Sequence, residues 1–145
     1  MFELGTDGPS TIVVGVDGST TSMRAGAYAA GLARRQKSRL VVVHVLTVRG
    51  LATLVPAGVV ALRQANQEIA EDLRRQVAEA AEARGVPVTF VAVQGDPYHE
   101  LVRVADQVRA DVVVVGASTK RHHRLAGSLA ARLVRAGRWP VTVVP

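Results

Sequence analysis

A loop that follows a run of four valines contains the residues of this sequence best suited to bind an anion. The valines end at Gly116, and Gly127-Ser128 opens an amphipathic segment further along the chain. Between the two glycines lie the cations Lys120, Arg121 and Arg124. Backbone N–H groups at a helix start and basic side chains both attract phosphate. We therefore expect this loop to contact a phosphate-bearing ligand, and the alternative is a basic loop that is merely solvated.

A second polar cluster, Asp17-Gly18-Ser19, follows another β-branched run, Thr11–Val16. Open α/β sheets bind ligands outside the carboxyl ends of their strands, where neighbouring strands send their connections to opposite faces. If this strand and the valine strand are neighbours, Asp17 and the Gly116 loop face one cleft. The alternative for Asp17 is a turn or helix-capping aspartate without a ligand.

The sequence contains no arrangement of side chains typical of a catalyst. His44 lies within an apolar run, as a structural histidine does, and His122-His123 have no carboxylate or cysteine nearby to complete a metal site. The GxSxG motif is absent, and no second acidic residue precedes Asp17 to help hold Mg²⁺. We expect no catalytic and no metal-ligating residue, and hence a protein that binds rather than turns over a substrate.

Length and composition indicate one globular domain. A chain of 145 residues, 48% hydrophobic and 21% charged, forms one full core but not two. The absence of cysteine fits a reducing compartment, and no apolar run is long enough to span a bilayer. The first residues resemble no secretory signal. We expect a flexible lead-in over residues 1–10, a domain over 11–145, no membrane association and a cytoplasmic location.

The net charge of +6 permits anionic partners but does not favour nucleic acid. Only 3% of the residues are aromatic, which leaves no stacking platform for single strands. The arginines are spread over several segments rather than gathered on one recognition helix. An ordinary basic surface explains the charge better than a nucleic-acid interface does.

Strands and amphipathic helices are expected to alternate along the chain. Continuous β-branched runs are typical of strands buried on both faces, and apolar residues at steps of three and four are typical of helices. The alternation predicts an α/β fold with one parallel, doubly wound sheet, helices on both faces and right-handed crossovers. The expected strands are Thr11–Val16, Arg39–Leu46, Pro87–Val93, Asp111–Val115 and Val141–Val144. The expected helices are Ser19–Gln36, Ala61–Arg84, Asp96–Val108 and Ser128–Ala136.

The segment Leu46–Val60 does not fit this alternation. It is apolar, but Gly50, Pro56 and Gly58 argue against a regular helix or strand. Irregular segments of this length are often functional. Three roles stay open, namely a cover over a ligand pocket, a contact with a partner chain, and a poorly ordered apolar loop.

Five segments resemble the motifs of the universal stress protein family, from Ile12 to Pro145. They are IVVGVDGS (Ile12–Ser19), RLVVVHV (Arg39–Val45), GDP (Gly95–Pro97), ADVVVVGAS (Ala110–Ser118) and AGSLAARLVRAGRWPVTVVP (Ala126–Pro145). The resemblance implies a Rossmann-like, five-stranded parallel sheet in the order 3-2-1-4-5. It also implies a homodimer formed through the last strand, Val141–Val144, and in one branch of the family bound ATP without strong catalysis.

The resemblance assigns the predicted nucleotide site residue by residue. Asp17, preceded by Gly15, matches the aspartate that meets adenine, and Val45 matches a backbone contact to the base. Ribose and phosphate positions match Val115, Ser118 and Leu129. The glycines and closing hydroxyl of the phosphate loop match Gly116, Gly127 and Ser128.

Thr119 departs from the pattern of the ATP-binding branch. In that branch the second loop glycine stands where this chain has Thr119, and nine rather than seven residues precede the closing glycine. Threonine resists the close backbone approach and positive φ that glycine allows, and a shorter loop offers fewer N–H groups. The side chains of Lys120, Arg121 and Arg124 are expected to offset part of this loss.

Together, these features predict a stress-response or signalling module that binds ATP or another adenine nucleotide, with Mg²⁺ only as the nucleotide's companion. Two alternatives stay open. One is a homodimeric interaction module of the same family that binds an unknown protein partner and no nucleotide. The other is a weak ATPase, which the lack of a placed base disfavours.

Overall fold

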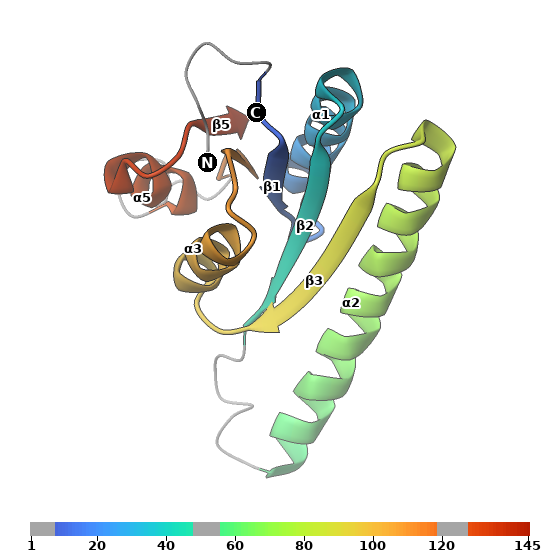
Figure 1. Cartoon of the computed structure of the whole chain (residues 1–145). Coiled ribbons are helices and arrows are strands. Elements are labelled where there is room, and N and C mark those ends of the chain that lie inside the picture. Colours follow the sequence, from blue (N-terminus) through green and yellow to red (C-terminus); the bar gives the residue numbers. More distant parts are fainter. Residues whose placement is uncertain (1–7, 48–55, 119–127) are drawn as a thin grey trace.

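A computed structural model of the chain describes residues 8–47, 56–118 and 128–145. Its centre is a five-stranded parallel sheet in the order β3-β2-β1-β4-β5 (Figure 1). The predicted α/β class and strand order are therefore confirmed. The strands are β1 Thr11–Gly15, β2 Arg39–Leu46, β3 Val88–Gln94, β4 Val112–Gly116 and β5 Val141–Val144. The helices are α1 Thr20–Gln36, α2 Pro56–Arg84, α3 Pro97–Gln107 and α5 Leu129–Ala136.

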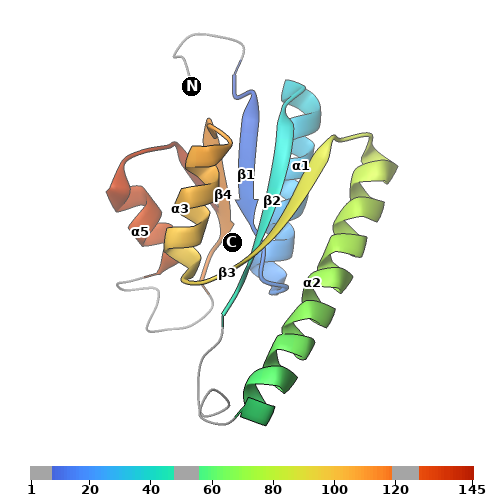
Figure 2. The same ribbon diagram turned by 60° about the horizontal axis from the view of Figure 1, so that its bottom comes forward.

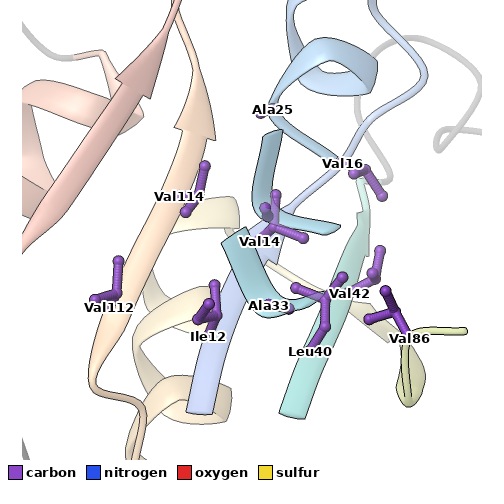
Figure 3. Close-up of a cluster of buried hydrophobic side chains, with 11 residues drawn as sticks. Ile12, Val14, Val16, Ala25, Ala33, Leu40, Val42, Val86, Val112 and Val114 are labelled. Carbon is purple, nitrogen blue, oxygen red and sulfur yellow. The ribbon is translucent and has the colours of Figure 1, made fainter. Parts of the chain in front are cut away.

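The helices cover the sheet from both sides, with α1 and α2 on one face and α3 and α5 on the other (Figure 2). Because side chains alternate along a strand, β1 sends Ile12 and Val14 to the first face and Val13 to the second. α1 meets the first face with Ala25, Ala29 and Ala33, all fully or almost fully buried. Figure 3 labels Ala25 and Ala33 beside the strand residues. Small alanines let the helix approach the valine strands closely, and the two-sided burial explains why the strands are continuous apolar runs.

The register aligns the carboxyl ends of the central strands. Val13 of β1 pairs with Val41 of β2 on one side and with Val113 of β4 on the other. β1 continues into α1 on the first face, whereas β4 leads toward α5 on the second. The chain connections therefore diverge between β1 and β4, which is the switch point where such sheets bind ligands.

Helix α2 corrects one sequence prediction, because it begins at Pro56 rather than at Ala61. Pro56 and Gly58 do not break it. Proline is well suited to the first helical position, since its missing N–H has no partner there, and one exposed-end glycine costs only about 1 kcal/mol. Of the irregular segment Leu46–Val60, residues 48–55 lie outside the described residues, so its three possible roles stay predictions.

The start of β1 is tied to the start of β4. Asp111 Oδ2 accepts hydrogen bonds from the Ser10 N–H at 2.9 Å, the Ser10 hydroxyl at 2.8 Å and the Thr11 N–H at 2.9 Å. The Ser38 hydroxyl donates to the Pro9 carbonyl. Residues 9 and 10 of the predicted lead-in thus have fixed partners, and residues 1–7 lie outside the described part of the chain.

Candidate functional site

A cleft of about 600 Å³ opens at the carboxyl ends of β1, β2 and β4, beside the first turns of α3 and α5. Eight of the ten residues predicted for the nucleotide site line it. They are Gly15, Asp17, Val45, Val115, Gly116, Ser118, Ser128 and Leu129. The other two, Thr119 and Gly127, lie outside the described residues, as do Lys120, Arg121 and Arg124. The fold thus gathers residues from three separate loops at one place.

Asp17 occupies a polar turn between β1 and α1. Its Oδ1 accepts the Ser19 N–H at 2.9 Å, and its own N–H donates to the Ser22 hydroxyl at 3.1 Å. Partial desolvation raises the pKa of Asp17, but the hydrogen bonds from Ser19 and Ser22 outweigh it and hold the pKa below its ordinary value. The carboxylate is therefore charged at neutral pH. It fills the turn role that the sequence left as the alternative, and it also faces the cleft.

Gly116 is required by packing as well as by its place in the cleft. A Cβ built at Gly116 would lie 2.5 Å from the Thr21 carbonyl carbon and 2.7 Å from the Ser22 nitrogen. Both are backbone atoms in the first turn of α1, which therefore passes directly over the end of β4. The Thr21 hydroxyl donates to the Ala117 carbonyl at 2.9 Å and joins the same two segments. The sequence predicted that Gly116 contacts phosphate. In the structure, the close approach of α1 already requires a glycine at this position.

Helix α5 begins at the cleft. Ser128 is its N-cap and accepts the Ala131 N–H at 3.1 Å, as expected for a serine at this position. Arg132 lies four residues further along, on the same helix face, and also lines the cleft. Sequence reasoning missed Arg132, because nothing in the apolar pattern of one short helix shows which arginine turns toward a neighbouring loop.

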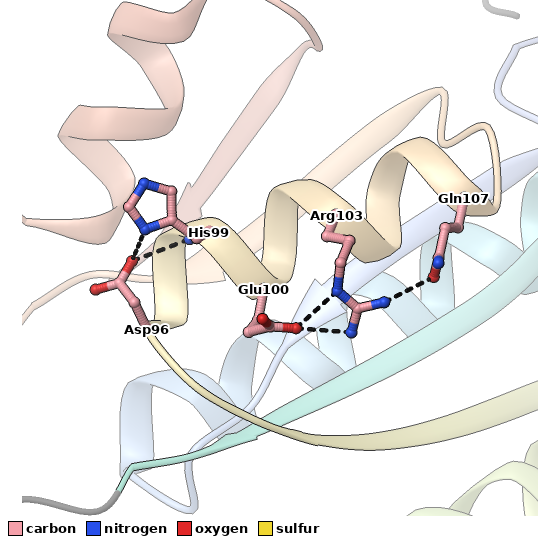
Figure 4. A network of polar contacts seen from close by, with 5 residues as sticks. All are labelled: Asp96, His99, Glu100, Arg103 and Gln107. Carbon is pink, nitrogen blue, oxygen red and sulfur yellow. Dashed lines mark hydrogen bonds and ion pairs between the residues drawn. The ribbon is translucent and has the colours of Figure 1, made fainter.

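Helix α3 contributes the opposite wall with Asp96, Pro97 and Tyr98. Asp96 is the predicted N-cap, and its Oδ2 accepts the His99 N–H at 3.0 Å and lies 2.9 Å from His99 Nδ1 (Figure 4). On the next turn, Arg103 donates twice to Glu100 Oε2, at 2.9 and 2.6 Å. These local contacts fix the first turns of α3 and hence the wall of the cleft. The Asp96-Pro97 start was visible in the sequence, but its place in the cleft was not.

His44 has a structural setting, as the sequence indicated. It is 5% exposed, and its Nδ1 lies 2.8 Å from the Val16 carbonyl, where it joins β2 to the end of β1. Within residues 8–47, 56–118 and 128–145, no three histidine or acidic side chains come together in a way that could hold a metal ion. The same part of the chain contains no helix with the length and hydropathy needed to cross a bilayer.

A second hollow, of about 460 Å³, lies between the start of α1 and helix α2. Its lining includes Met23, Ile69 and Leu73 but none of the predicted site residues. It opens on the other side of the sheet from α3 and α5. The cleft at the ends of β1 and β4 is therefore the candidate site.

The fold and this cleft define a doubly wound α/β protein whose polar loops meet at the topological switch point. A sequence model described as the universal stress protein family matches residues 9–145. The chain belongs to the universal stress protein family.

Individual relatives agree with this assignment. A universal stress protein of Methanocaldococcus jannaschii is 29% identical over 136 residues, which cover 92% of this chain and 80% of the relative. A crystal structure of a family member from Burkholderia pseudomallei is 29% identical, with a TM-score of 0.72 over 94% of this chain and 96% of the other. A universal stress protein solved in complex with cAMP is 28% identical, with a TM-score of 0.74 over 94% of this chain and 97% of the other.

Proposed function

We propose that this protein binds an adenine nucleotide in the cleft at the ends of β1 and β4 and acts as a signalling module through that binding. The observation that carries the proposal is the convergence of the predicted residues. Asp17 follows β1, Val45 lies at the end of β2, and Ser118 and Ser128 lie at the two ends of the connection from β4 to α5, yet all line one cleft. A relative of similar fold is solved with cAMP, which is itself an adenine nucleotide.

The chemistry of the cleft suits such a ligand. Val43, Leu101 and Leu129 supply apolar wall for a flat base, whereas the hydroxyl-bearing Ser118 and Ser128 lie toward α5. The charged Asp17 carboxylate is an acceptor for an amino group of adenine or a ribose hydroxyl. A mainly apolar cleft with a few convergent polar groups is the usual form of a small-molecule site.

The ionisable groups of the cleft support the proposal of binding without turnover. Among its described lining residues, the charged ones are Asp17, Asp96 and Arg132. Asp17 and Asp96 each accept a neighbouring backbone N–H with one oxygen, and the lowered pKa of Asp17 makes it a weak general base. The proposed mechanism is a shift of the conformational or dimeric state on binding. Mg²⁺ enters only as the companion of a nucleotide triphosphate.

Two further parts of the proposal concern the whole protein. We propose a homodimer formed through Val141–Val144, the edge strand β5, and a cytoplasmic location. In a dimer, nucleotide binding in one protomer can alter the conformation of its partner. The dimer proposal is based on the unpaired edge of β5.

Isothermal titration and thermal shift with AMP, cAMP and ATP, the last with and without Mg²⁺, test the nucleotide proposal. A ligand at a hundred times its Kd adds about 2.7 kcal/mol to the free energy of unfolding and raises Tm. Asp17→Asn keeps an acceptor for the Ser19 N–H, so it should weaken binding without unfolding the turn. Glu79→Gln, at an exposed acid of α2 outside the cleft, is the matched control. If no adenine nucleotide raises Tm, and none is released from the purified protein on denaturation, the interaction module is the better description.

A further inference from the structure

Arg132 is a cation held in the wall of the cleft with hydrogen-bonding capacity to spare. Its guanidinium carbon lies 4.1 Å from the centroid of the Tyr98 ring, which holds the planar group against α3. Its Nη1 lies 3.7 Å from Asp96 Oδ2, beyond hydrogen-bond distance. Within the described residues, its N–H groups donate no hydrogen bond. The side chain is 37% exposed, so a ligand in the cleft can reach it.

A second arginine, Arg138, lies at the other end of α3 and forms a direct hydrogen bond to an aspartate. Arg138 lies over the Trp139 ring at 4.7 Å, and its Nη2 is 2.5 Å from Asp106 Oδ1. Both arginines thus combine an aromatic face with an aspartate of α3, but only Arg138 makes a direct hydrogen bond. Asp106 has no helix-cap duty, whereas Asp96 Oδ2 already accepts from His99. Arg132 therefore faces a carboxylate whose nearest oxygen is engaged elsewhere.

We propose that Arg132 is the anion-recognition residue of the cleft and that it selects nucleoside phosphates over nucleosides. This inference rests on the proposed nucleotide function and adds to it the group that reads the phosphate. Stacking on Tyr98 fixes the plane of the guanidinium, and a phosphate can then accept two parallel N–H groups from its edge. Among the described lining residues Arg132 is the one cation, so it is the natural counter-ion for that charge.

Asp96 gives the proposal a second consequence. A bound phosphate and the Asp96 carboxylate compete for the same guanidinium, because both are anions and Arg132 lies between α3 and the cleft. Phosphate binding therefore loosens the Arg132–Asp96 pair that joins α5 to α3. Binding of an anion in the cleft would thus weaken the contact between α3 and α5.

Calorimetric titration of the full chain with AMP and with adenosine tests the assignment. In Arg132→Ala and Arg132→Gln, we expect the Kd for AMP to rise about ten- to a hundredfold, as for loss of a charge-assisted pair, while the Kd for adenosine stays within about twofold. Arg135→Ala removes the same charge from the same helix away from the cleft and should change neither. Asp96→Asn keeps a good N-cap and should tighten AMP binding about two- to fivefold by removing the competing charge.

The outcomes separate this inference from the proposed function. Unchanged AMP affinity in Arg132→Gln would overturn the role of Arg132 while leaving nucleotide binding intact. Equal loss of AMP and adenosine affinity would also overturn it, since that is the signature of a structural role. If wild-type protein binds neither ligand, the proposed function itself fails, and the role of Arg132 fails with it.

Discussion

At the scale of single residues, Asp111 is a buried, hydrogen-bonded carboxylate that has a structural role rather than a ligand-binding one. It is 1% exposed and accepts three hydrogen bonds from Ser10 and Thr11. Burial raises the pKa of Asp111, but the bonds from Thr11 and Ser10 outweigh it and hold the pKa below the ordinary value of 3.8. The charged carboxylate thus links the starts of β1 and β4, at the opposite end of these strands from the cleft.

Asp111 should make stability fall in acid. Because the folded-state pKa is below the unfolded-state value, its contribution is complete above about pH 4 and is lost as pH falls through the folded pKa. Asp111→Asn should lower the free energy of unfolding by about 1–3 kcal/mol at pH 7 and flatten the decline below pH 4. Urea unfolding from pH 2 to 7 measures both, with Glu79→Gln at an exposed acid of α2 as control. A variant with the same acid slope as wild type would assign the pH dependence to other carboxyl groups.

Gly116 separates two explanations that look alike in the sequence. Since a Cβ there would meet backbone atoms of Thr21 and Ser22 at 2.5–2.7 Å, Gly116→Ala should destabilise the fold by about 2 kcal/mol or more even without ligand. Gly31→Ala in α1 is the control, because its Cβ would meet nothing within 4 Å and alanine favours the helix by about 0.5–1 kcal/mol. Thermal unfolding should lower Tm for the first and raise it for the second. A neutral Gly116→Ala would mean that α1 shifts at no cost.

At the scale of elements, helix α2 is attached to the sheet mainly through its second half. Its buried residues are Ala70 and Leu73, and Arg74 lies over the Phe90 ring of β3 at 4.8 Å. Nothing in the described turns before Ala70 is buried, and Figure 1 shows these turns extending past the end of the sheet. An amphipathic pattern that continues from Leu62 to Ala80 therefore overstates how much of the helix the core uses.

Leu73 should carry the attachment of α2. Leu73 is 4% exposed, so Leu73→Ala should lower the free energy of unfolding by about 2–4 kcal/mol through lost burial and a cavity. Ile69, one turn earlier, is 49% exposed, and Ile69→Ala should cost well under about 1 kcal/mol. Denaturant unfolding measures the free energy of unfolding of each variant, and an m-value equal to that of wild type shows that only stability has changed. Equal losses at the two positions would show that the first half of α2 is buried in solution.

The sequence predicted the sheet of this protein but not the start of α2 or the role of Arg132. The valine runs of β1, β2 and β4 predicted a parallel sheet because burial on both faces demands them, and the family motifs supplied the strand order. The start of α2 was missed because proline breaks a helix only in its interior. The residue type alone does not show whether Pro56 lies in the interior or at the first position of the helix. Arg132 was missed because its neighbours Tyr98 and Asp96 belong to another helix, and only packing brings them together.

At the scale of the whole molecule, the parallel sheet has two open edges among its described strands, β3 and β5. Unpaired edges offer backbone N–H and C=O groups to another chain. β5 is the shorter edge and carries Val143, which is 42% exposed on the α5 side. An exposed valine in the middle of a four-residue edge strand favours β5 as the surface that a second copy covers.

A charge at that edge tests the proposed dimer. Val143→Lys should convert dimers to monomers, because pairing through β5 would desolvate the ammonium between two copies. Thr89→Lys on β3 is the matched control, since Thr89 is exposed on the same side of the sheet at its other edge. Sedimentation equilibrium measures the association, and circular dichroism checks that both variants fold. An intact Val143→Lys dimer, or a Thr89→Lys monomer, would move the interface away from β5.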